Sequence, residues 1–174
     1  MLKLKGDKIY LRALEPEDLQ FLYELENDTS IWEISGTTTP YSKHVLQLYL
    51  DNVHRDIYEV KQLRLCVCDL EDTIVGLVDL FDYDPKNNRA GLGILIKNLN
   101  KRNQGTGSQA IILLLEYAFS VLNIHQIFAN VAEDNKASIH VFEKLGFEKV
   151  GLKKDWILVD GSYKNEILYQ KIKK

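Results

Sequence analysis

The feature that most constrains this chain is a glycine-bearing turn between an apolar segment and a helix. Residues 94–96 (ILI) are typical of a buried strand, and residues 102–110 (RNQGTGSQA) follow after a polar spacer. The next apolar run predicts a helix over about 108–122. Glycines let the backbone approach a ligand closely, and the first turn of a helix has N–H groups without partners at its positive end. With Arg102 and no acidic side chain in it, the turn predicts a site for a phosphate or pyrophosphate.

The composition is that of one soluble globular domain covering residues 1–174. Hydrophobic residues make up 45% and charged residues 27% of the chain. No apolar run approaches the roughly 20 residues of a membrane helix, and the first residues do not form a signal peptide, so we expect a cytoplasmic protein without a membrane partner. The net charge of −3 argues against nucleic acid as the main partner. Cys66, Cys68 and the four histidines lack disulfide or metal-ligand spacing, so we expect no metal.

The pattern along the chain predicts a mixed α/β (α+β) domain with helices flanking a mostly antiparallel sheet. Short turns join the three middle strands, and such connections favour antiparallel neighbours. The strands are expected at 10–12, 64–69, 73–83, 89–96, 126–131, 147–150, 157–159 and 167–172. The helices are expected from Pro16, from Ser42 through Val53, over 108–122, and over 136–145 before Gly146. Residues 27–41 are expected to be irregular.

Two alternatives compete for the glycine turn. Residues 105–110 (GTGSQA) also satisfy the dinucleotide pattern G-x-G-x-x-G/A, with Glu133 at a suitable distance for a ribose. In a dinucleotide fold, however, the glycines follow their strand almost at once and begin a βαβ series. Here residues 97–104 intervene and antiparallel strands precede them, which disfavours that interpretation. A helix that begins with glycines and binds no ligand remains the simpler alternative.

Three segments resemble the GNAT superfamily of acyl-CoA-dependent N-acetyltransferases. Residues 102–107 (RNQGTG) fit that family's R/Q-x-x-G-x-G/A signature. Residues 130–147 resemble its strand, its Asn-x-x-Ser/Ala helix start and its Leu-Gly-Phe ending, and residues 11–19 (LRALEPEDL) resemble its opening. Within the superfamily the chain is most similar to the spermidine and diamine N-acetyltransferases and to their ribosomal-protein N-terminal acetyltransferase relatives.

The resemblance implies acetyl-CoA as cosubstrate and a splayed pair of parallel strands beside it. The turn would hold the CoA pyrophosphate, and the strand at 94–96 would pair with the pantetheine arm. For Asn135 and Ser138, ordinary helix capping is an equally good interpretation. The coenzyme-binding residues that the resemblance implies are Ile94, Leu95, Ile96, Arg102, Asn103, Gln104, Gly105, Thr106, Gly107, Ser108, Asn135, Ser138 and Phe142.

Acetyl transfer to an amine needs a base, a donor to the oxyanion and a proton for the leaving thiolate. The resemblance implies Asp79 as the base, acting through water, and Asp79 with Glu33 as substrate-binding residues. A solvated strand carboxylate is the alternative for Asp79. The polyamine enzymes have a proton-donating tyrosine where this chain has Phe142, and many relatives have a glutamate where it has Gly91.

Tyr163 and Tyr169 are further candidates for the proton donor, with core packing as the alternative for each. No residue is placed to carry an acyl group, so we expect direct transfer in a ternary complex. The expected acceptor is a primary amine, by resemblance a polyamine or diamine. The N-terminus of a ribosomal or other protein is the second choice, and a non-catalytic acyl-CoA-binding module is a third. Enzymes of this type assemble into rings, so a homo-oligomer is among the implied partners.

Overall fold

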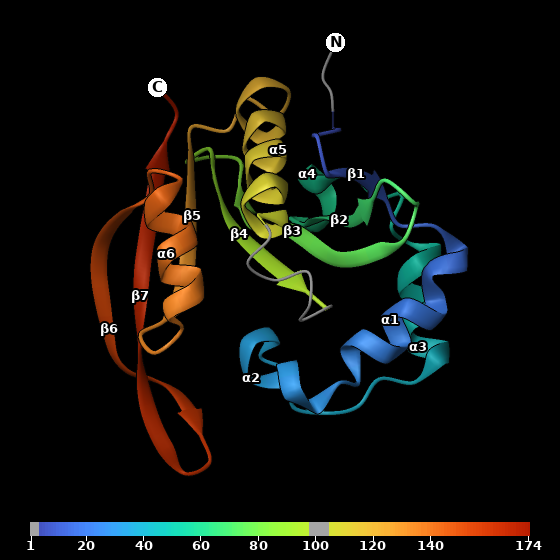
Figure 1. The fold of residues 1–174 in the computed structure, drawn as a ribbon, viewed down its shortest axis with the longest axis horizontal. Helices are drawn as coiled ribbons and strands as arrows, with labels where there is room; N and C mark the ends of the chain where they lie inside the picture. The colour runs from blue at the N-terminus through green and yellow to red at the C-terminus, as the bar shows by residue number, and fades with distance from the viewer. Residues whose placement is uncertain (1–3, 98–104) are drawn as a thin grey trace.

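The computed structural model describes residues 4–97 and 105–174 (Figure 1). Its N-terminal part contains β1 (Ile9–Ala13), η1 (Pro16–Asp18), α1 (Leu19–Glu26), η2 (Thr29–Ile31), α2 (Trp32–Ser35), α3 (Lys43–Asp51) and α4 (Ile57–Val60). The central hairpins are β2 (Leu63–Asp69), β3 (Ile74–Asp84) and β4 (Arg89–Ile96). The remainder is α5 (Thr106–Ser120), β5 (Gln126–Ala132), α6 (Lys136–Lys144), β6 (Glu148–Val159) and β7 (Ser162–Ile172).

All seven named strands form one sheet in the order β1-β2-β3-β4-β5-β7-β6. Each neighbouring pair is antiparallel except β4 and β5, which are parallel and pair only over Arg89–Gly91 and Gln126–Phe128. Beyond Gly91 the two strands diverge, and the sheet opens between them (Figure 1). The predicted fold class, with its splayed parallel pair, is confirmed.

Two apolar clusters sandwich the sheet. On one face α5 and α6 contribute Ile111, Leu114 and Phe142 to a large cluster. On the other face α1 and α3 pack Leu22 and Leu46 against the strands. The helices bury these side chains because their apolar residues recur at helical spacing along one side. The sheet is therefore covered on both faces, and its open end lies between the two groups of helices.

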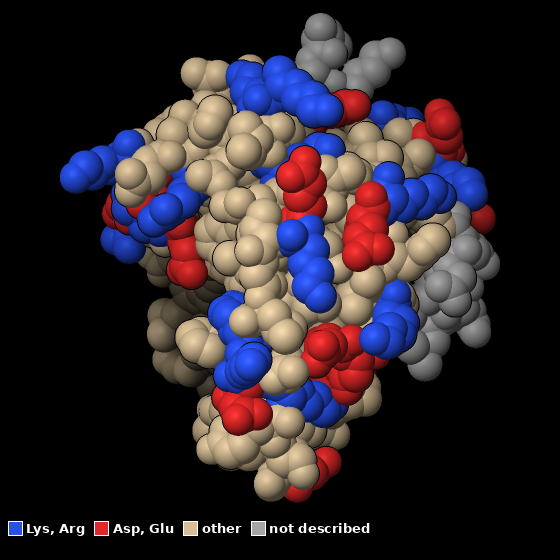
Figure 2. All heavy atoms as spheres, turned by 90° about the vertical axis from the view of Figure 1, so that its left-hand side faces the viewer, with Lys and Arg blue, Asp and Glu red and all other residues tan. Residues whose placement is uncertain are grey.

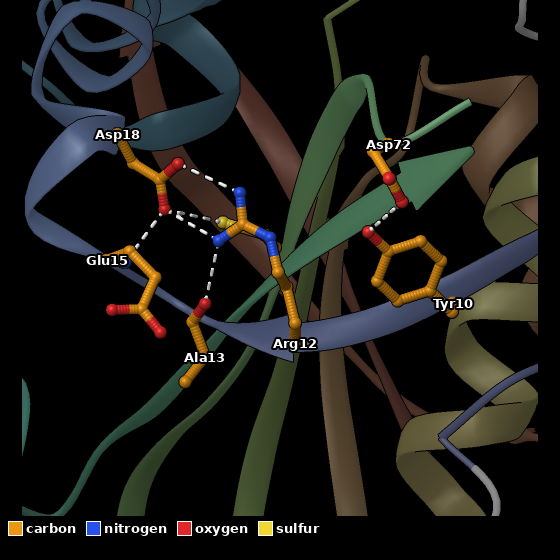
Figure 3. Close-up of polar contacts among 7 residues, drawn as sticks. Tyr10, Arg12, Ala13, Glu15, Asp18 and Asp72 are labelled. Atoms are coloured by element: carbon orange, nitrogen blue, oxygen red, sulfur yellow. Dashed lines mark hydrogen bonds and ion pairs between the residues drawn. The ribbon is translucent and has the colours of Figure 1, made fainter. Parts of the chain in front are cut away.

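An ion pair in the interior joins β1 to the beginning of α1 (Figure 3). The Arg12 guanidinium donates to both carboxylate oxygens of Asp18 at 2.8 and 2.9 Å, and the Glu15 N–H donates to Asp18 at 2.8 Å. Burial works to raise the pKa of Asp18, but these hydrogen bonds outweigh it and hold that pKa below its ordinary value. The contact fixes the direction in which α1 leaves the sheet.

Both cysteines lie on β2, and both are free and fully buried in the cluster beneath α1 and α3. They point to one face of the strand, as their spacing predicts. Burial raises the pKa of the Cys66 thiol to about 12. They are structural, apolar-like side chains in this fold.

The structure differs from the sequence expectation in three segments. Residues 27–41 were expected to be irregular but contain η2 and α2, and residues 54–62 contain the unexpected α4. Asp28 and Asp56 cap η2 and α4 locally, but these helices are too short to show a periodic pattern. The strands expected at 147–150 and 157–159 are parts of the single strand β6, whose register shifts twice. Its exposed middle lacks the alternation that identifies a strand.

The face formed by the C-terminal strands carries charges of both signs. Figure 2 shows Lys and Arg side chains interspersed with Asp and Glu, without a continuous basic area among the described residues of this face. In the described ranges, no helix is long and apolar enough to cross a membrane.

Candidate functional site

A cleft of about 960 Å³ opens where β4 and β5 diverge. One wall carries residues of α1, α2 and α3, and the other carries residues of β5, α6 and β7. Residues 92–95 of β4 form its floor between them. The cleft therefore occupies the opening in the sheet.

The glycine turn at the beginning of α5 lies beside Ile94, a residue of β4 that lines the cleft. Gly105 has a left-handed backbone (φ +83°), and a Cβ there would meet no atom within 4 Å. A Cβ on Gly107 would lie 3.7 Å from Ile94, so the first turn of α5 stands against β4. The first helical bond comes from Gln109 N–H to Gly105, so the preceding N–H groups have no partner within the helix. This local geometry fits an anion such as a diphosphate.

The predicted turn residues Arg102, Asn103 and Gln104 lie outside the described residues. Of the other predicted turn residues, Gly105 is exposed, the Thr106 side chain is buried, and Gly107 and Ser108 are partly buried. The prediction that these four contact a pyrophosphate stays a prediction.

The edge of β4 that faces the cleft is open. Residues 92–95 pair with β3 on one side, whereas the pairing with β5 ends at Gly91. Among the described residues, no strand covers their other edge, so an extended ligand with amide groups could add itself there as a strand would. The predicted residues Ile94 and Leu95 line the cleft, and Ile96 packs beside Gly107.

The three predicted residues at the N-cap of α6 and within that helix, Asn135, Ser138 and Phe142, also line the cleft. Asn135 is the N-cap of α6, and its Oδ1 accepts a hydrogen bond from the Ser138 N–H at 3.1 Å. Capping is thus carried out by Asn135, not by the Ser138 side chain. Phe142 is 4% exposed and stacks edge-on against Phe147 at 5.0 Å. Each of these three residues remains available for a coenzyme contact, because each lines the cleft.

On the opposite wall, Asp79 is held by an arginine. Arg64 Nε lies 2.6 Å from Asp79 Oδ1, and Arg64 Nη1 lies 3.1 Å from Glu26 Oε1. The guanidinium also stands over the Tyr49 ring at 5.8 Å. Arg64 Nη2 also donates to the second oxygen, Oδ2, over the longer distance of 3.5 Å. Each carboxylate oxygen has two lone pairs, so Asp79 can still accept from a water or an amine, and Oδ2 is the oxygen that Arg64 binds less closely.

Glu33 lies at the mouth of the cleft in a second ion pair. Lys164 of β7 places its Nζ 2.7 Å from Glu33 Oε1 and 2.7 Å from Asp134 Oδ2. Its hydrogen bonds to Asp134 and then to Glu33 raise the pKa of Lys164 above its usual range. The bridge joins α2 on one wall to the segment between β5 and α6 on the other.

The remaining sequence candidates for acid–base chemistry do not reach the cleft. Tyr169 is fully buried and donates to Glu143 at 2.9 Å, and burial together with this bond raises the pKa of Tyr169 to about 12. Tyr163 is 63% exposed and does not line the cleft. Tyr169 is a core-packing residue, the alternative considered for it above. Neither tyrosine hydroxyl lies where it could protonate a leaving thiolate.

The space above Gly91 is filled by aromatic side chains. A Cβ at Gly91 would lie 2.4 Å from the Phe81 ring, which packs edge-on against Phe128 at 5.7 Å between centroids. The glycine therefore makes room for the Phe81 ring. A glutamate at this position would displace that ring.

Sequence reasoning missed Arg64 and Lys164. Neither belongs to a motif, and each becomes a site residue only through cross-strand pairing or a distant contact. Arg64 stands opposite Asp79 in the β2–β3 register, and Lys164 meets Glu33 across 131 positions of sequence. A signal was available only for Arg64, which is a charged residue in the largely apolar strand β2, since a charged residue on a half-buried strand usually has a partner.

Comparison with known proteins decides the family. Residues 8–148 match the family model described as an acetyltransferase (GNAT) domain. This chain belongs to the GNAT acetyltransferase family. As a family member it is an acetyltransferase that uses acetyl-CoA as its acyl donor.

Individual GNAT relatives match more than nine tenths of the chain. The spermidine N(1)-acetyltransferase of Escherichia coli strain K12 is 31% identical over 160 residues, covering 91% of this chain and 83% of that protein. A crystal structure of the spermidine N-acetyltransferase from Vibrio cholerae in complex with CoA and spermine is 26% identical, with a TM-score of 0.86 over 96% of each chain. A dodecameric structure of the Vibrio enzyme is 28% identical, with a TM-score of 0.80 over 96% of this chain and 95% of that chain.

Proposed function

We propose that this GNAT enzyme transfers the acetyl group of acetyl-CoA to a primary amine of a polyamine or diamine. The transfer is direct, within a ternary complex in the cleft. The observation that carries the proposal is the open edge of β4, which has the first turn of α5 at one end and carboxylates on the neighbouring wall. This arrangement brings a site for a CoA-like chain next to a site for a cation.

The donor half uses the main chain. The pyrophosphate is bound by N–H groups of the glycine turn and the first turn of α5, and the pantetheine arm pairs along residues 92–95. A β4 N–H near Leu95 donates to the oxyanion that forms on the thioester carbonyl. Because the thioester is already reactive, the protein's task is to position the two substrates and exclude water.

The acceptor half uses carboxylates. Glu26, Glu33, Asp79 and Asp134 all line the cleft, and their negative charge attracts an amine that carries several positive charges. One amine must lose its proton before it attacks, and the Asp79 oxygen that Arg64 binds less closely takes that proton through water. The names of the relatives support a polyamine, since the Escherichia coli and Vibrio cholerae proteins compared are both spermidine acetyltransferases. By the same likeness we propose a homo-oligomer and a cytoplasmic location.

A thiol-release assay tests this function. The protein is incubated with acetyl-CoA and, separately, spermidine, putrescine and short peptides with free N-termini, and free CoA is followed over time. We expect CoA release with the polyamine and diamine and little with the peptides. Release with peptides alone would replace the proposal by N-terminal acetylation. Calorimetric binding of CoA without release for any amine would instead indicate a non-catalytic acyl-CoA-binding module, which Phe142 in place of a proton donor makes a specific alternative.

A further inference from the structure

The ammonium group of Lys164 lies where a cationic ligand would be expected. It is bound by two carboxylates from opposite walls of the cleft, Glu33 of α2 and Asp134 of the segment before α6, at 2.7 Å each. We propose that Lys164 is a specificity-determining residue: its ammonium occupies the subsite for the second positive charge of the acceptor, and an acceptor binds there by displacing it. This inference rests on the proposed function and names one subsite within it.

The geometry of the bridge is that of a bound amine. A primary ammonium with two carboxylate partners is what a terminal amine of a diamine or polyamine would also form, at the same distances. All three side chains line the cleft. Lys164 reaches this position from the fixed strand β7, whereas Glu33 and Asp134 lie in short segments outside the sheet.

Exchange is feasible because the bridge is only partly buried. The Lys164 side chain is 30% exposed and those of Glu33 and Asp134 are 38% and 58% exposed, so the displaced ammonium can return to water. Pairs with this exposure contribute little net stability. Arg64 differs, because its side chain is 22% exposed and both its carboxylate partners are below 20%. Arg64 stays in place while Lys164 can leave.

The exchange separates amines by their number of charges. When an acceptor with a second ammonium displaces Lys164, that ammonium forms ion pairs with both carboxylates in place of the lysine. A monoamine has only the reacting nitrogen, so it leaves the ion pairs of Lys164 with Glu33 and Asp134 intact. These two carboxylates add nothing to its affinity. Lys164 therefore weakens the binding of multiply charged amines by competing with them, and its removal should favour those amines selectively.

The test measures spermidine binding by calorimetry in the presence of CoA, which requires no turnover. Lys164→Gln should bind spermidine roughly three- to tenfold more tightly than the unmodified protein at low salt, and less so at high salt. Lys164→Arg keeps the charge and should bind like the unmodified protein. Adding Glu33→Gln to Lys164→Gln should remove most of the gain. Arg55→Gln is the matched control, because it removes an equal charge from an exposed ion pair with Glu59 that does not line the cleft.

Steady-state kinetics supply the second readout. The KM for spermidine should fall in Lys164→Gln by a similar factor, while the KM for butylamine stays unchanged. Unaltered or weaker spermidine binding in Lys164→Gln, or an equal gain in Arg55→Gln, would overturn the inference even if the enzyme acetylates spermidine. Tighter binding in Lys164→Gln with no acetylation of any amine would instead uphold the subsite and refute the proposed function.

Discussion

Asp18 keeps its negative charge in the interior because donors surround it. Arg12 provides two hydrogen bonds and Glu15 provides a third from its backbone (Figure 3). Cys66 Sγ lies 3.6 Å from the same carboxylate. Removing one member of such a buried pair leaves the other without compensation, which costs more than the pair itself contributes.

Asp18→Asn should therefore reduce the free energy of unfolding by about 2–4 kcal/mol at pH 7. Because the folded-state pKa of Asp18 is lowered, its contribution is complete above the unfolded-state pKa of about 4 and is lost as the pH falls through the folded-state value. Urea unfolding followed by tryptophan fluorescence, from pH 7 down to about pH 3, should show the two proteins converging in acid.

Asp72→Asn is the matched control. Asp72 accepts one hydrogen bond from the Tyr10 hydroxyl at 2.8 Å at an exposed position, and asparagine tolerates its positive φ. We expect a change of about 0.5 kcal/mol or less. An equal loss in both variants, or a loss for Asp18→Asn that persists in acid, would contradict the role assigned to Asp18.

For single residues, the sequence predicted interactions between near neighbours in the chain but not pairings between distant residues. Ser42 accepts the predicted capping bond from Val45 N–H, and Gly146 has the predicted left-handed backbone. Both depend on neighbours within a few positions. The partner of Asp79 depends instead on the register of β2 against β3, which contains a shift after Val67. A one-residue slip would turn Arg64 to the other face, so its contact could not be read from the chain.

Among the elements, α6 combines two roles at its beginning. Asn135 caps the helix through Oδ1 and also lines the cleft. Capping and coenzyme contact make different demands, because a serine can accept the capping bond but has no amide group to donate. Substitutions can therefore separate the two roles.

We expect Asn135→Ala to lose about 1 kcal/mol of stability and Asn135→Ser to lose much less. If the Asn135 amide contacts the coenzyme, CoA affinity should fall in both variants, because both lack the amide. Thermal unfolding gives the first quantity and calorimetry with CoA the second. A CoA affinity that falls only in Asn135→Ala would show that capping alone accounts for this residue.

The long elements could be predicted, and the irregular ones could not. The helices α1, α3, α5 and α6 carry apolar residues at helical spacing, and β2 to β5 are apolar strands between clear turns. The opening between β4 and β5 came from the family resemblance, since periodicity does not reveal where parallel strands part. In the structure they part after Gly91, beneath the Phe81 and Phe128 rings. That contact joins three strands and is invisible in any one of them.

In the molecule as a whole, the sheet separates two apolar layers, and Cys66 and Cys68 lie at one of these interfaces. Both are 0% exposed. A thiol reacts as its thiolate, which burial disfavours, so reagents should reach these side chains only when the layers separate.

A disulfide reagent at pH 8 should therefore find no reactive thiol in the native protein within minutes. In guanidinium chloride it should find the two that the sequence contains. Absorbance of the released thiolate measures both. Rapid reaction of the native protein would contradict the closed core. Because neither cysteine is expected to react in the native protein, the same reagent can also be used to follow CoA release.

The ion pairs around the cleft have a consequence for how this scaffold can diversify. Glu33, Asp134 and Lys164 join segments at its mouth, and none of them is among the buried residues that hold the sheet together. A substitution at one of these positions changes which amines bind, and it does not require the apolar layers beneath to repack. Proteins that descend from one ancestor can thus acquire different amine specificities through a few surface substitutions while they inherit the same framework.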